Sequence, residues 1–179
     1  FNPAGQAIAR DKAPFAQKQF GGTLGGPLKR DRTFYFLSFE RLDISAHNFV
    51  TIDDTNNVTF LGQPLGTPAA ILRRAGFAVE TGHVPYDIRS NQFLGKVDHQ
   101  LNTNNSLTGR FNWANDFNEN IEPFGGNVAR SRGAVLDSSD LMLALSHTSV
   151  LSTRMVNEVR FQAAGRDQAV ESLDPRCAG

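Results

Sequence analysis

The stretch FLGKVDHQL, residues 93–101, decides the fold, because apolar or small residues at its odd positions alternate with mostly polar residues at its even positions. A period of two indicates a β-strand with one apolar and one polar face. After the turn-forming Asn102-Thr103-Asn104-Asn105, the alternation resumes in LTGRFNW, residues 107–113. These two runs predict an antiparallel hairpin over residues 92–115.

Two further hairpins follow the same rule, over residues 19–42 and 139–165, with short turns near Lys29–Arg32 and Ser152–Thr153. The short turns alternate with long connections, 47–90 and 116–136. Short periplasmic turns, long extracellular loops and strands of about ten residues are typical of outer-membrane barrels. We therefore predict an all-β fold of antiparallel transmembrane β-barrel strands. About six strands are too few for closure, since single-chain barrels begin at about eight, so we expect an incomplete barrel.

Within the first long connection, residues 68–74 favour one or two helical turns before Gly76. The composition excludes other classes of protein. Lys plus Arg equals Asp plus Glu, and no run of basic residues suggests nucleic-acid binding. The apolar run Leu141–Leu145 falls far short of the roughly 18 residues that a transmembrane helix needs. A single cysteine, Cys177, excludes an internal disulfide and a multi-cysteine metal site.

We find no pattern that predicts catalysis, a cofactor or a metal, and we expect the chain not to be an enzyme. The glycine pairs Gly21-Gly22 and Gly25-Gly26 lack the Gly-Lys-Ser/Thr of a phosphate loop and are better suited to bending a barrel wall. Asp98 and His99 are adjacent on a strand and point to opposite faces, so they cannot act on one atom. The histidines lack metal-ligand spacing: His47, His83, His99 and His147.

Two groups of residues are candidates for a functional role. Charged residues on the polar faces of the strands are predicted to line the lumen and to form cross-strand ion pairs, with solute contact as the alternative: Lys96, Asp98, Arg110, Glu158 and Arg160. Aromatic residues are predicted to lie at the two membrane interfaces, with core packing in a soluble protein as the alternative: Phe34, Tyr35 and Phe36 after the basic turn, and Trp113 at the opposite rim.

The segment QFGGTLGGPLKRDRTFYFLSFERL, residues 19–42, resembles the hairpin at the start of the barrel in Oar-like TonB-dependent receptors, a group that often carries a carboxypeptidase-regulatory-like domain. Its features are a Gly-Gly-Thr-Leu-Gly-Gly-Pro strand, a basic turn and an aromatic return strand. The segments NQFLGKVDHQLNTNNSLTGRFNW and LSTRMVNEVRFQAAGR are similar to later strands of the same barrels. The resemblance covers most of the chain apart from the long connections.

The resemblance implies a plugged barrel in the outer membrane of a Gram-negative bacterium, which takes up a scarce solute with energy from the TonB system. Its partners would be outer-membrane lipid, the TonB system through the plug of the parent protein, and an unknown solute. The sequence has no signal sequence, plug domain or TonB box, so we expect an internal barrel fragment. A structural or adhesive barrel without active transport is the alternative function.

Overall fold

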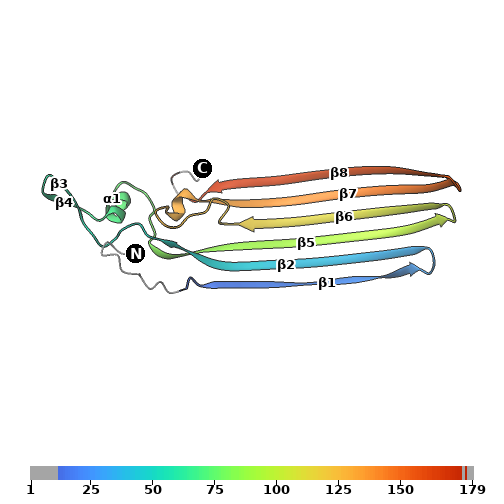
Figure 1. The fold of residues 1–179 in the computed structure, drawn as a ribbon, viewed down its shortest axis with the longest axis horizontal. Helices are drawn as coiled ribbons and strands as arrows, with labels where there is room; N and C mark the ends of the chain where they lie inside the picture. Colours follow the sequence, from blue (N-terminus) through green and yellow to red (C-terminus); the bar gives the residue numbers. More distant parts are fainter. Residues whose placement is uncertain (1–11, 175, 177–179) are drawn as a thin grey trace.

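Six long strands lie side by side in one antiparallel sheet in the computed structural model, which describes residues 12–174 and 176 (Figure 1). Cys177 lies outside the described residues. The strands pair in the order β1-β2-β5-β6-β7-β8. Their bounds are Phe15–Lys29 for β1, Thr33–Val50 for β2, Gly82–Asn102 for β5, Asn105–Asn118 for β6, Ala134–Ser152 for β7 and Met155–Ser172 for β8. The six strands follow one another in the sheet in the order in which they occur along the chain, and the all-β antiparallel fold predicted from the sequence is confirmed.

Short turns join the strands at one end of the sheet, and side chains within the turns fix their shape. In the turn between β5 and β6, the Asn102 carboxamide oxygen accepts hydrogen bonds from the Asn104 backbone N–H at 3.0 Å and from the Asn105 side chain at 2.8 Å. In the turn between β1 and β2, Asp31 has a φ of 60°, a left-handed conformation that Asp tolerates better than most residues. The sequence places turn-forming residues where these conformations need them.

The long connections lie together at the other end of the sheet (Figure 1). The first contains a small hairpin of β3 (Val58–Phe60) and β4 (Gln63–Gly66), followed by helix α1 (Pro68–Arg74). The second contains a 3-10 turn, Arg130–Arg132. Both connections are shorter than the sequence analysis predicted, because β2, β5, β6 and β7 continue into the regions 47–90 and 116–136. The helical turns predicted at 68–74 coincide with α1.

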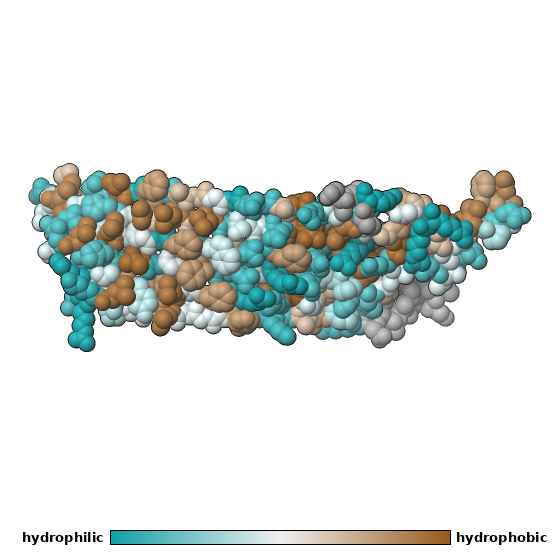
Figure 2. All heavy atoms as spheres, turned by 180° about the vertical axis from the view of Figure 1, so that it is seen from behind, coloured by the Kyte–Doolittle hydropathy of each residue, from teal (hydrophilic) through white to brown (hydrophobic). Residues whose placement is uncertain are grey.

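One face of the sheet is apolar over the half nearest the short turns, and the register aligns its rows across the strands. Leu37, Gly95, Phe111, Leu143 and Ala163 form one such row. On β5 the apolar face runs from Phe93 to Leu101, about 27 Å at ~3.4 Å per residue. Figure 2 shows this face, with hydrophobic side chains gathered over the half nearest the short turns. That height is close to the ~25 Å apolar band of an outer-membrane barrel.

Beyond this band the two faces of the sheet exchange polarity, which explains why the ends of the predicted strands were missed. The face that carries Phe39 continues with Arg41 and Asp43, whose side chains form an ion pair at 2.8 Å. The opposite face becomes apolar there, and Val50 and Val84 are buried to 2% and 1% exposure against Phe124 of the second long connection. Strand alternation therefore persists in residues 42–50 and 82–90. There the face that is polar over the rest of the sheet packs a small hydrophobic core against the second long connection.

The sheet is not closed, because β1 and β8 each have one paired neighbour in the described part of the chain. An open antiparallel sheet of this size is consistent with an incomplete barrel. No helix in residues 12–174 is long and apolar enough to cross a membrane.

Candidate functional site: the polar face of the sheet

The five charged residues predicted to line a lumen share one face of the sheet. Lys96 lies opposite Arg110 across β5 and β6, and Asp98 lies opposite Thr108. Glu158 and Arg160 lie opposite Thr148 and Ser146 of β7, on the same face. The register thus brings together, on one face, residues more than fifty positions apart in the sequence. We call this face of the sheet, with Lys96, Asp98, Arg110, Glu158 and Arg160, the polar wall.

The ion pairs on this wall differ from those predicted. Lys96 pairs with Asp98 at 2.9 Å, and Arg160 pairs with Glu158 at 2.8 Å, so both pairs form between residues i and i+2 of a single strand. The prediction of cross-strand pairs among these five residues is wrong. The cross-strand neighbour of Lys96 is another cation, Arg110, so the carboxylate two residues along its own strand is the available partner.

Hydroxyl groups supply the cross-strand contacts instead. The Thr108 hydroxyl donates a hydrogen bond to Asp98 at 2.7 Å, and the Ser146 hydroxyl donates one to Glu158 at 3.0 Å. Arg110 donates from Nε to the Asn112 carboxamide oxygen at 3.1 Å and forms no ion pair within the described residues. The guanidinium of Arg110 therefore keeps donors available to a ligand on this face.

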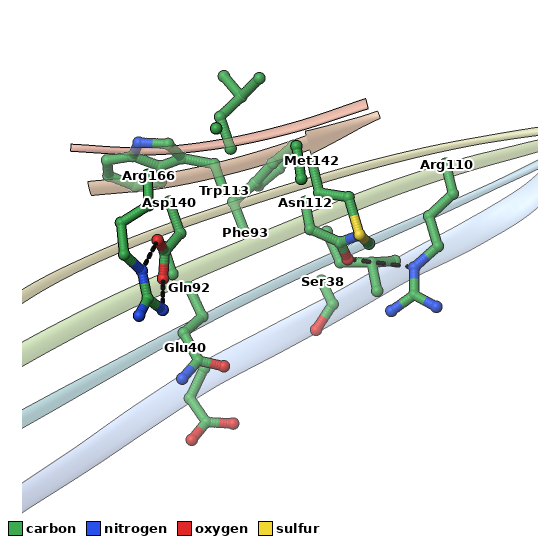
Figure 3. Close-up of a pocket in the computed structure, with 15 residues that line it drawn as sticks. Ser38, Glu40, Gln92, Phe93, Arg110, Asn112, Trp113, Asp140, Met142 and Arg166 are labelled. Carbon is green, nitrogen blue, oxygen red and sulfur yellow. Dashed lines mark hydrogen bonds and ion pairs between the residues drawn. The ribbon is translucent and has the colours of Figure 1, made fainter. Parts of the chain in front are cut away.

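A cavity of about 600 Å³ opens on the same face, and Arg110 is the one charged residue predicted from the sequence that lines it. One row of the register contributes Glu40, Gln92, Asp140 and Arg166 to its lining. Asp140 and Arg166 are joined by two hydrogen bonds, at 2.6 and 2.7 Å. Figure 3 shows Glu40, Gln92 and Arg110 pointing to one side of the sheet and Trp113 pointing to the other.

Sequence analysis did not single out this row, although the same alternation contains it. Glu40, Gln92 and Arg166 are each flanked by residues of the apolar face, namely Phe39, Phe93 and Gly165. The missing information was the register between strands, because alternation within a strand does not say which residues of different strands lie at one level.

The four predicted interface aromatics divide between the two faces. Tyr35 lies opposite Val97, and Trp113 lies between Phe93 and Leu141, so both are on the apolar face. Phe34 and Phe36 lie opposite Asp98 and Lys96, on the polar face. Near the short turns, the prediction of an aromatic girdle therefore applies to Tyr35 alone, since successive side chains of a strand point to opposite faces.

Long antiparallel strands, an apolar band of membrane height on one face and a polar wall on the other define a class of protein, the integral β-barrels of the outer membrane. The family model described as an outer membrane beta barrel domain matches residues 1–59 and 68–175, and the chain belongs to this family. The protein is therefore located in the outer membrane of a Gram-negative bacterium. Comparison with curated proteins and with solved structures gave no match. A barrel domain of this kind points to a structural or transport role.

Proposed function

We propose that these strands are part of the wall of an outer-membrane receptor that takes up a scarce solute, with energy supplied by the TonB system through a plug carried elsewhere in the parent protein. The apolar face is the lipid surface, and the polar face lines the lumen. The long connections are extracellular and the short turns periplasmic. The resemblance of residues 19–42 to the first barrel hairpin of Oar-like TonB-dependent receptors supports this assignment.

The observation that carries the proposal is the polar wall. A barrel that only anchored an adhesin would need a filled or sealed interior, whereas this wall opens into a cavity of about 600 Å³ and exposes donors and acceptors from several strands. Arg110 and Glu40 lie on it and form no ion pair within the described residues, and the Glu40 carboxylate accepts a hydrogen bond from the Gln19 amide at 2.6 Å. A polar, partly unpaired wall suits contact with a removable plug and a passing solute.

The experiment compares three strains of the native host: wild type, a deletion of the gene that encodes these strands, and a deletion of TonB. Untargeted mass spectrometry of the growth medium follows the depletion of each solute with time. We expect at least one solute that the wild type depletes and that both deletion strains leave in the medium. Equal depletion in all three strains, with weaker surface attachment of the gene deletion, would support the adhesive alternative and overturn uptake.

A further inference from the structure

A second cavity, of about 240 Å³, lies between the two long connections. We call it the loop cavity. Its apolar lining comes from the segment that follows β2, from helix α1, from the segment that follows α1 and from the second connection: Ile52, Leu72, Phe77, Val79, Val128 and Ala129. It shares no lining residue with the cavity on the polar wall, and both connections lie at the opposite end of the strands from the short turns (Figure 1).

Hydrogen bonds between and within the connections hold the walls in place. The Thr51 N–H group donates to the Gly126 carbonyl at 2.6 Å, and the Gly126 N–H group donates to the Phe49 carbonyl at 2.8 Å. These two hydrogen bonds tie the second connection to the end of β2. The Arg73 guanidinium donates from Nε to the Val79 carbonyl at 3.0 Å, which ties α1 to the segment that follows it. A cavity with fixed walls binds a ligand without the cost of ordering loops.

The turn that begins the first connection is also fixed, because Asp53 accepts hydrogen bonds from the side chain and backbone of Asn56 and from Thr55. These hydrogen bonds, the Asn56 side chain foremost, hold the pKa of Asp53 well below its usual range. The carboxylate is thus charged throughout the physiological pH range, and the turn keeps its hydrogen bonds there.

The loop cavity keeps apolar surface in contact with water. Phe77 is 40% exposed and Val128 is 39% exposed. The Arg176 guanidinium lies 3.9 Å from the centre of the Phe77 ring and covers one side of it. An apolar cavity of ~150 Å³ is sufficient to bind benzene. The loop cavity is therefore large enough for an aromatic ring with one substituent.

A cation lies among the lining residues. Arg132 pairs with Glu122 at 2.5 Å, and the two side chains are 74% and 56% exposed. Ion pairs so exposed contribute little to stability, so a ligand carboxylate can displace Glu122 at small cost. Ser131 also lines the cavity and carries a hydroxyl group that can donate to the same carboxylate.

We propose that the loop cavity binds a small aromatic carboxylate, with the ring between Phe77 and Val128 and the carboxylate beside Arg132. The inference rests on the proposed function in one respect, because it assigns the cavity as the place where the receptor first holds its solute. It goes further in naming the chemical class, an aromatic acid of about one ring.

The test uses the full-length receptor in detergent micelles and fluorine NMR, with 4-fluorobenzoate as the probe and 4-fluorobenzamide as its neutral counterpart. We expect the fluorine signals of both probes to broaden in the presence of the receptor, because each probe binds to it. Ala129→Phe fills the cavity and should weaken the binding of both probes by at least about tenfold. Arg132→Gln should weaken the binding of 4-fluorobenzoate alone. Leu61→Ala, at the tip of the β3–β4 hairpin, is the control and should bind as the wild type does.

Equal affinity of the wild type and Ala129→Phe for the probes would overturn the proposal. Equal losses of affinity in Ala129→Phe and Leu61→Ala would overturn it as well. If Ala129→Phe fails to fold, Leu72→Ala provides the test, because a larger cavity should shift preference from 4-fluorobenzoate to 6-fluoro-2-naphthoate. An unchanged preference would contradict the assignment.

The uptake experiment separates the two proposals. The receptor could bind 4-fluorobenzoate in a way that depends on Ala129 while no solute shows TonB-dependent depletion. That result would support the proposed ligand of the loop cavity and overturn the proposed uptake. TonB-dependent depletion of other solutes by a receptor that binds neither probe would overturn the loop cavity alone.

Discussion

Asp140 on β7 and Arg166 on β8 lie directly opposite each other on the polar face and form a doubly hydrogen-bonded ion pair, with oxygen–nitrogen distances of 2.6 and 2.7 Å. It connects neighbouring strands, unlike the pairs Lys96–Asp98 and Arg160–Glu158, which lie within one strand. Opposite charges at paired positions favour one register of the strands over shifted ones.

The first prediction concerns this ion pair. Asp140→Arg alone places two cations opposite each other and should reduce the folded yield of the protein in lipid vesicles, since like charges at paired positions are destabilising. The exchange Asp140→Arg with Arg166→Asp should recover most of the yield. Heat-modified migration on gels measures the folded fraction. An exchange variant as poor as the single variant would show that the pair does not set the register.

The second prediction tests which face meets lipid, with two adjacent alanines of β8. Ala163 lies opposite Leu143 on the apolar face, and Ala164 lies opposite Met142 on the polar face. Ala163→Arg should lower the free energy of unfolding in lipid vesicles by about 2–4 kcal/mol if it lies near mid-membrane, and Ala164→Arg should have little effect. Denaturant titrations of the protein in lipid vesicles give both values. Equal decreases in the free energy of unfolding of the two variants would mean that the lipid-facing and lumen-facing sides of the sheet are assigned wrongly.

The third prediction uses two adjacent glycines of β1. A Cβ at Gly21 would lie 2.5 Å from the Phe39 carbonyl oxygen, closer than real Cβ atoms come, whereas a Cβ at Gly22 would meet nothing within 4 Å. Gly21→Ala should therefore force β1 away from β2 and lower the free energy of unfolding of the protein by about 1–3 kcal/mol, the usual cost of overpacking.

Gly22→Ala is the matched control, because it changes the same residue type one position along the strand and should be tolerated. The same denaturant titrations apply. Similar losses in both variants would indicate a general dependence on glycine flexibility and would contradict the role of close strand approach at Gly21.

The fourth prediction concerns orientation. Leu61, at the tip of the β3–β4 hairpin, is 88% exposed, and Thr103 lies in the short turn at the opposite end of the sheet. Leu61→Cys should react with a membrane-impermeant maleimide on intact cells. Thr103→Cys should react only after the outer membrane is permeabilised, since short turns are periplasmic in barrels of this kind. The reverse pattern of labelling would invert the proposed topology.

Much of the fold was predictable because the chemistry of a barrel strand is local. The alternation in residues 93–101 and 107–113, together with the Asn-rich turn between them, predicts a hairpin without any tertiary information. The structure pairs Phe93 with Trp113 and Gly95 with Phe111, so the residues that the alternation assigns to the apolar face lie opposite one another. The ends of the strands were less predictable, because the faces exchange polarity beyond Arg41 and a fixed apolar face no longer marks the strand.

The sequence by itself determined the six long strands apart from their ends, the short turns, the helical segment at 68–74 and the class of outer-membrane barrel, since each depends on residues that are neighbours in the chain. The tertiary structure alone decided the row of Glu40, Gln92, Asp140 and Arg166, the partners of Lys96 and Arg160, and the loop cavity. These features depend on the register between strands and on the packing of two connections far apart in the chain. Contacts of that kind join residues that no local pattern relates, so only the folded chain brings them together.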